Sequence, residues 1–314
     1  MKENIEPIEN YGLSSMNGSS SLFSKVGICG GGAVGCQIAQ MVSRRGIDVI
    51  FIETSEEKIN NFIDDMSAEL DEIINRWSIT QGEKRAILSR IKGSTDFNAL
   101  NGCSIVIEAF KVESSNNFLA VRKDVLKKIE KAVEKDTIIA TNTSTLKVSE
   151  LASELHHPER CVNLHITISA PEASIVEVVK GLHTNESTYK NAIKFVELLN
   201  KIVIPVKEST GLISVRLFVS IINEACNILN EGVGRIEDID KTMRFGMGMF
   251  LGPFEMADKI GLDKLLRWAN NIYDGFGDLK YKPSPLIEKM INENQLGIAT
   301  KAGFYKYDDK GKKM

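Results

Sequence analysis

Residues 165–179 read HITISAPEASIVEVV, in which a histidine precedes a glutamate that lies inside an apolar run. Neutral imidazole can accept a proton near neutral pH, and a carboxylate on its second ring nitrogen would fix the tautomer and stabilise the imidazolium. Two interpretations are open. His165 and Glu177 are either a proton-transfer pair brought together by the fold, or a loop histidine followed by an ordinary strand.

The elements that must position such a pair begin near Lys25. The stretch KVGICGGGAVGCQIAQMVSRRGIDVIFIE reads as an apolar strand, a glycine turn, a helix and a second strand. Its GxGxxG pattern allows a tight turn, close approach of a pyrophosphate and helix–strand packing, and the free amides at the helix start face the anion. The residues expected to bind a dinucleotide here are Gly30, Gly32, Ala33, Val34 and Gly35.

Glu53 ends the second of these strands. Its carboxylate can accept hydrogen bonds from both hydroxyls of the adenosine ribose, and it would repel a 2′-phosphate. The sequence therefore predicts NAD as the cofactor rather than NADP.

Two further apolar runs, SIVIEAF (104–110) and TIIATNTST (137–145), are typical of buried parallel strands, with a helix between them. In an open parallel sheet the cleft lies outside the carboxyl ends of the strands. The residues expected to line the cofactor and substrate cleft are Glu108, Ala109, Asn142 and Ser144.

The predicted fold class is α/β, a Rossmann-type doubly wound sheet followed by a C-terminal all-helical domain whose apolar residues recur at helical spacing. We expect a flexible N-terminal extension over 1–24, because that segment is polar and rich in Ser, Asn and Gly, unlike a signal peptide. The NAD-binding domain is expected over 25–208 and the helical domain over 209–314.

The composition fits a soluble globular protein, with 43% hydrophobic and 26% charged residues. A net charge of -3 argues against nucleic acid as a partner, and we predict neither a membrane span nor a metal site. The five cysteines show no CxxC spacing, which favours a reducing cytoplasm.

Several phrases, in order, resemble the 3-hydroxyacyl-CoA dehydrogenases, including the bacterial 3-hydroxybutyryl-CoA type. They are TNTSTL, ELHHPERCVNLH, IVEVVKG, GPFEMADKIGLD, YKPSPL and GFYKY, and the likeness runs from about Lys25 to Tyr307. It implies that His165 is the catalytic base, that Glu177 orients it and that Ser144 hydrogen-bonds the substrate oxygen. It also implies a basic residue, Arg122, near the nicotinamide ribose, and a helical domain that forms a homodimer.

The chain departs from the family pattern on the substrate side. Ile168 and Val215 replace asparagines, and Ala299 replaces a lysine for which Lys301 is a candidate substitute. The stretch 110–120 is about five residues longer than the matching family turn. Glu113 is the candidate for the glutamate of that turn, but the insertion leaves its alignment with the family open.

The loss of two hydrogen-bond partners would nearly abolish the usual reaction of the family. We therefore expect NAD-dependent oxidation of the 3-hydroxyl of an acyl thioester that differs from the usual family substrate, carried on CoA or an acyl carrier protein. One such substrate is glyceryl-carrier protein, which leads to hydroxymalonyl or methoxymalonyl extender units in polyketide biosynthesis. The alternatives are a 3-hydroxybutyryl-CoA dehydrogenase of fatty-acid or butyrate metabolism, a catalytically weak NAD-binding relative like the lens lambda-crystallins, and a dehydrogenase of small hydroxy acids.

Overall fold

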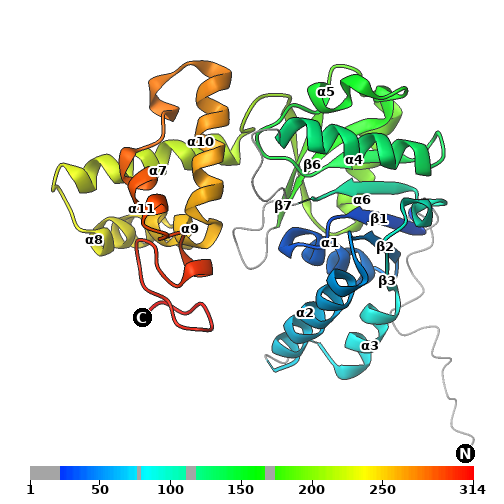
Figure 1. The fold of residues 1–314 in the computed structure, drawn as a ribbon, viewed down its shortest axis with the longest axis horizontal. Coiled ribbons are helices and arrows are strands. Elements are labelled where there is room, and N and C mark those ends of the chain that lie inside the picture. The colour runs from blue at the N-terminus through cyan, green and yellow to red at the C-terminus, as the bar shows by residue number, and fades with distance from the viewer. Residues whose placement is uncertain (1–21, 76–78, 111–117, 167–173) are drawn as a thin grey trace, which may run out of the picture. The chain divides into compact units, whose positions relative to one another are not determined.

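The computed structural model describes residues 22–75, 79–110, 118–166 and 174–314 (Figure 1). These residues divide into two compact units. The first contains the described residues up to 142 together with 148–165 and 174–205, and the second contains 143–147, 166 and 206–314. Each unit is described separately below.

The first unit is built on an eight-stranded sheet with the order β3-β2-β1-β4-β5-β6-β7-β8. The strands are β1 (Lys25–Cys29), β2 (Asp48–Ile52), β3 (Ile91–Ser94), β4 (Ile105–Glu108), β5 (Ile138–Thr141), β6 (Cys161–Ile166), β7 (Ile175–Lys180) and β8 (Ile202–Lys207). Strands β1 to β6 pair in parallel wherever they are neighbours. Every residue of β4 and β5 is buried, as their uninterrupted apolar character predicts.

Helices cover both faces of this sheet. The chain moves from β1 to β2 in one direction and from β4 to β5 in the other, so right-handed crossovers place α1 and α4 on opposite faces (Figure 1). The helices of this unit are α1 (Ala33–Ser43), α2 (Glu56–Asn75), α3 (Gln81–Ser89), α4 (Phe118–Ala132), α5 (Val148–Leu151) and α6 (Glu186–Leu198), with short 3-10 turns at η2 (Phe97–Leu100), η3 (Ala152–Glu154) and η4 (Pro158–Arg160). The predicted α/β class is confirmed.

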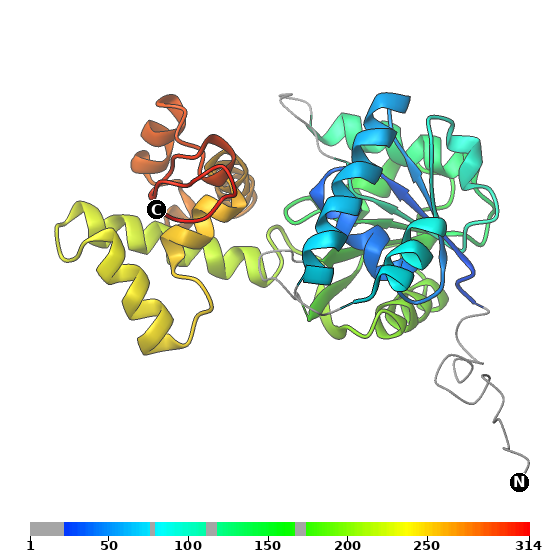
Figure 2. The ribbon, with the colours of Figure 1, turned by 90° about the horizontal axis from the view of Figure 1, so that it is seen from below.

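The second unit is helical (Figure 2). Its elements are α7 (Ser214–Asn230), α8 (Ile236–Lys241), the π-helical turn η5 (Thr242–Gly246), α9 (Pro253–Ile260), α10 (Leu262–Phe276), η6 (Leu279–Tyr281), α11 (Pro285–Asn292) and η7 (Ile298–Thr300). Buried side chains from α7, α9 and α10, such as Val219, Phe254 and Ile272, form one apolar core. The predicted helical C-terminal part is confirmed.

Two buried carboxylates tie the last residues of the chain to this core. Asp240 accepts hydrogen bonds from the amides of Phe254 and Glu255 at the start of α9, and from the Tyr305 hydroxyl at 3.0 Å. Asp258 accepts the Tyr307 hydroxyl at 2.9 Å and two backbone amides of the same C-terminal stretch. Burial raises the pKa of both carboxyls, against the hydrogen bonds that they accept. The phrases GPFEMAD and GFYKY thus meet in one polar network.

Candidate active site

The side chains of His165 and Glu177 meet on neighbouring strands of the sheet. Nδ1 of His165 lies 2.6 Å from Oε2 of Glu177, and the two residues are 5% and 1% exposed. His165 lies in β6, two residues beyond Asn163, which is in register with Thr141 at the end of β5. The imidazole therefore lies at the carboxyl edge of the parallel strands, where an open α/β sheet has its binding crevice.

This arrangement tests the second interpretation of residues 165–179. His165 is part of a strand and is buried, so the interpretation as a loop histidine is wrong. A carboxylate can only accept, which assigns the proton to Nδ1 and leaves the lone pair on Nε2. An imidazole oriented in this way can take a proton from a hydroxyl.

The glycine turn is packed too closely for other residues. Gly30 has a φ of +111°, and a Cβ built on it would lie 2.8 Å from the carbonyl oxygen of Ala109. A Cβ on Gly35 would lie 1.9 Å from the carbonyl oxygen of Gly30. Gly32 caps α1 without a side chain, and Ala33 and Val34 open the helix, so backbone amides line its first turn.

Glu53 follows β2 and lies beside this turn. Its Oε1 accepts the amide of Gly31 at 2.5 Å, and its Oε2 accepts the amide of Thr54 at 2.9 Å. Each oxygen retains acceptor capacity for a ribose hydroxyl. Free helix amides for a pyrophosphate, a turn with no room for side chains and a pre-oriented carboxylate fit a bound NAD.

At the ends of β4 and β5, the position of the Glu108 side chain differs from the prediction. Glu108 was expected to line the cleft, but it is 0% exposed. Its carboxylate accepts from Thr141 Oγ1 at 2.8 Å, from the amide of Phe110 at 2.8 Å and from Arg122 Nη1 at 2.5 Å. A buried charge needs such partners, so Glu108 is turned inward.

The other predicted residues lie near the same strand ends. Ala109 follows Glu108 directly and is 8% exposed, and the backbone N–H of Asn142 donates to the Glu108 carbonyl oxygen at 2.8 Å. Ser144 is half-buried and lies three residues beyond the end of β5. Arg122 lies in α4, and its guanidinium binds Glu108 and the carbonyl oxygen of Phe110.

The residues that depart from the family pattern lie in different surroundings. Val215 is 3% exposed and belongs to the apolar core of the helical unit. Ala299 is exposed, and the ammonium of Lys301 pairs with Asp309. Ile168 and Glu113 lie outside the described residues.

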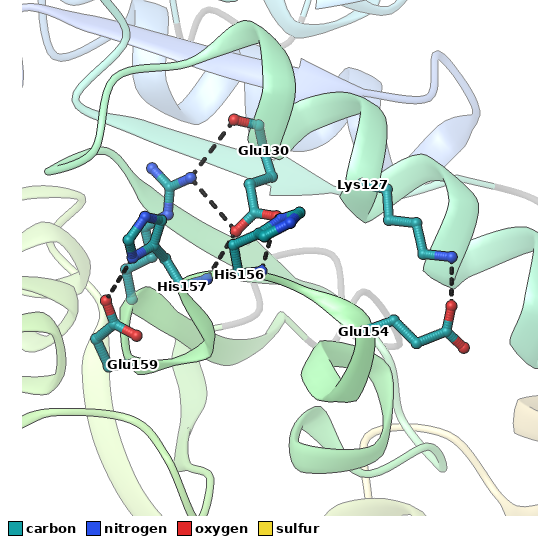
Figure 3. Close-up of polar contacts among 7 residues, drawn as sticks. Lys127, Glu130, Glu154, His156, His157 and Glu159 are labelled. Atoms are coloured by element: carbon teal, nitrogen blue, oxygen red, sulfur yellow. Dashed lines mark hydrogen bonds and ion pairs between the residues drawn. The ribbon is translucent and has the colours of Figure 1, made fainter.

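Sequence reasoning missed the role of the residues around Glu130, in α4 (Figure 3). Glu130 accepts the amides of His156 and His157 at 3.0 and 2.9 Å, and Arg160 lies 3.7 Å from its carboxylate. Burial alone would raise the pKa of Glu130, but these amides, the His156 ring and Arg160 hold the pKa below its usual range. The cluster anchors the turn that leads into β6. The contacts of its two histidines, His156 and His157, are with Glu130 and Glu159 and serve the structure of this turn.

The described part of the chain contains no group of three or more His, Cys, Asp and Glu side chains arranged for a metal ion. No helix within the described ranges is both long and apolar enough to cross a bilayer.

Two family models match nearly the whole chain. The NAD binding domain of 3-hydroxyacyl-CoA dehydrogenase matches residues 25–209, and the C-terminal domain of 3-hydroxyacyl-CoA dehydrogenase matches residues 211–307.

Individual relatives agree with these models. A 3-hydroxybutyryl-CoA dehydrogenase from Clostridioides difficile is 34% identical over 284 residues, which cover 90% of this chain and 99% of that protein. The crystal structure of (S)-3-hydroxybutyryl-CoA dehydrogenase PaaH1 from Ralstonia eutropha superposes with a TM-score of 0.83 at 33% identity, covering 91% of this chain and 100% of the other. FadB2 of M. tuberculosis superposes with a TM-score of 0.86 at 28% identity, covering 91% and 99%.

Proposed function

The chain belongs to the 3-hydroxyacyl-CoA dehydrogenase family of NAD-dependent oxidoreductases, and we propose that it oxidises the 3-hydroxyl of a short acyl-CoA such as 3-hydroxybutyryl-CoA. The observation that carries the proposal is the buried contact of 2.6 Å between His165 Nδ1 and Glu177 Oε2. It leaves one imidazole nitrogen free to take the hydroxyl proton at the edge of the sheet that faces the cofactor crevice.

The reaction separates one hydrogen atom as a hydride and another as a proton. When bound, NAD would supply the acceptor for the hydride that leaves C3. His165 Nε2 takes the proton of the 3-hydroxyl as the carbonyl forms, and the negative charge of Glu177 stabilises the resulting imidazolium. In this proposal Ser144 donates a hydrogen bond to the reacting oxygen and holds it in line with the imidazole.

The cofactor end of the proposal rests on the glycine turn and Glu53. Amides of the first turn of α1, including those of Ala33 and Val34, would hold the pyrophosphate, and Glu53 would hold the adenosine ribose. The contact of Glu53 with the Gly31 amide supports this, because it orients the carboxylate beside the turn. Ala109 and Asn142, at the ends of β4 and β5, would line the cofactor side of the cleft.

Two of the relatives named above are 3-hydroxybutyryl-CoA dehydrogenases, which favours a CoA thioester over the acyl carrier protein expected from the altered substrate residues. The position of Val215 in the core of the helical unit weakens the argument from that substitution, because its side chain is used for packing. We therefore prefer 3-hydroxybutyryl-CoA to glyceryl-carrier protein.

One experiment separates these substrates. The purified protein is incubated with NAD and either (S)-3-hydroxybutyryl-CoA or glyceryl-carrier protein, while NADH absorbance and the acyl mass are followed. We expect NADH and an acyl mass lower by two hydrogens with the CoA ester. Turnover with the carrier protein alone would reject the CoA proposal, and binding of NAD without turnover of either substrate would indicate a catalytically weak relative. His165→Ala serves as the blank.

We further propose a homodimer formed through the helical unit, in a reducing compartment such as the cytoplasm. Exposed apolar side chains of that unit, Phe245, Met247 and Phe250, support a covered surface. The five cysteines are free and buried, and burial raises the pKa of Cys36 and Cys161 to about 12, which suits thiols that stay reduced. Light scattering coupled to gel filtration tests the dimer, and a monomer at micromolar concentration would reject it.

A further inference from the structure

A buried ion pair joins α4 to the carboxyl ends of β4 and β5. Arg122 is 8% exposed, and its Nη1 donates to Oε2 of Glu108 at 2.5 Å. Thr141 donates its hydroxyl to the same oxygen at 2.8 Å. Glu108 is the last residue of β4, and Thr141 is the last residue of β5. The carboxylate of Glu108 therefore links helix α4 to the ends of strands β4 and β5.

The same pair holds the peptide that follows β4. Phe110 donates its amide to Oε1 of Glu108 at 2.8 Å, and its carbonyl oxygen accepts from Arg122 Nη2 at 3.2 Å. Both polar groups of Phe110 are thus bound by the ion pair. The backbone of residues 109 and 110 cannot shift without breaking a charge-assisted hydrogen bond.

This peptide is the wall against which the glycine turn packs. A Cβ on Gly30 would lie 2.8 Å from the Ala109 carbonyl oxygen and 2.8 Å from Cα of Phe110. The amide of Ala109 also donates to the carbonyl oxygen of Cys29, just before the turn, at 2.8 Å. A displacement of residues 109 and 110 would therefore be transmitted to Gly30 and to the amides that follow it.

We propose that Arg122 and Glu108 are positioning residues for the dinucleotide turn. Arg122 acts through Glu108 and the 109–110 peptide, and not as a ligand of the nicotinamide ribose, because its side chain is buried and Nη1 and Nη2 each donate a hydrogen bond within the protein. An ion pair excluded from water contributes little net stability compared with an apolar pair, but it has a directional geometry. The inference rests on the proposed use of the glycine turn for NAD.

The test measures NAD binding by calorimetry without acyl substrate. Arg122→Met and Glu108→Gln are each expected to raise the Kd for NAD about tenfold or more. The Kd of the double variant for NAD should be no higher than that of the single variant with the higher Kd, since the two residues act as one unit. Thr141→Val, which leaves the buried ion pair of Arg122 with Glu108 in place, should raise this Kd by about threefold, and the Kd for the acyl-CoA should stay within about twofold throughout.

Lys123→Met is the matched control, because the neighbouring Lys123 pairs with Glu154 instead of with the strand ends. Its Kd for NAD should equal that of the wild type. Weaker NAD binding in Arg122→Met with normal binding in Glu108→Gln would make Arg122 a direct ligand and overturn the proposal. Normal NAD binding in a folded Thr141→Val protein would also overturn it, which covers the case in which the charge variants do not fold. Failure of the wild type to bind NAD would instead reject the proposed function.

Discussion

Glu177 Oε2 lies 2.6 Å from His165 Nδ1, although the two residues are 12 positions apart and belong to different strands. The histidine is in β6 and the glutamate in β7, so sheet formation itself brings the acid to the ring. Because both side chains are buried, their contact is shielded from water, and the orientation of the imidazole is fixed before any substrate binds.

Replacing His165 by Ala should lower kcat by a factor of about 10² to 10⁴, because the proposed acceptor of the hydroxyl proton is removed. The Kd for NAD should be unchanged, since the glycine turn and Glu53 are intact. Stopped-flow absorbance of NADH and calorimetric titration with NAD measure the two quantities. The exposed His183 gives the control variant His183→Ala, and normal turnover of His165→Ala would disprove the role as a base.

Replacing Glu177 by Gln keeps an oxygen that can accept from Nδ1 but removes the negative charge. The imidazolium is then less stabilised, and we expect kcat to fall by at least about 100-fold with a much smaller change in the KM for the acyl-CoA. Steady-state kinetics at saturating NAD measure both constants. A change confined to KM would show that Glu177 serves substrate binding instead.

Replacing Glu53 by Ala should raise the Kd for NAD by about tenfold to 100-fold, as expected when a charged hydrogen-bond acceptor is lost. The preference for NAD over NADP should shrink, because the charge that repels a 2′-phosphate is gone. Titration with each cofactor and with the acyl-CoA measures the effect, and Glu57→Ala on the exposed first turn of α2 is the control. Equal weakening of NAD and acyl-CoA binding would contradict the assignment.

Replacing Glu130 by Gln should lower the free energy of unfolding at pH 7 by about 1–3 kcal/mol, because two backbone amides lose a charged acceptor. The folded-state pKa of Glu130 lies below its usual range. Its contribution is therefore fully present above the ordinary glutamate value of about 4.3 and is lost as the pH falls through the folded value.

The stability gap between the wild type and Glu130→Gln should accordingly narrow on acidification. Urea titrations at pH 7, 4 and 3 measure it. Glu159→Gln in the same turn is the control, because Glu159 is half-buried and contacts the His157 ring instead of the two backbone amides. A gap that is independent of pH would show that the charge of Glu130 has no part in stability.

In the helical unit, Asp258→Ala should cost at least about 3 kcal/mol of stability, since two amides and the Tyr307 hydroxyl lose their acceptor in the core. Tyr307→Phe removes only one donor and should cost about 1 kcal/mol. Thermal unfolding followed by circular dichroism compares the two variants. Equal losses would argue against a network centred on the carboxylate.

The sequence alone determined the features that depend on local chemistry. The GxGxxG turn, the apolar strands at 104–110 and 137–145 and the carboxylate of Glu53 follow from residue type and spacing, and the structure has strands and a turn at these places. Family phrases added the pairing of His165 with Glu177, which the coordinates bring into contact. Strand ends were predicted less well, because β5 ends at Thr141, before the polar residues that were counted with it.

Only the tertiary structure decided which charges are buried and what they bind. Glu108 was expected at the cleft and Arg122 at the ribose, but helix α4 brings them together. In the same way, Glu130 finds the amides of residues 156 and 157, and Val215 joins the core of the helical unit. The physical reason is common to all of these. A charged or apolar side chain shows its chemistry in the sequence, whereas its partner depends on strand register and helix placement, which only the packed chain fixes.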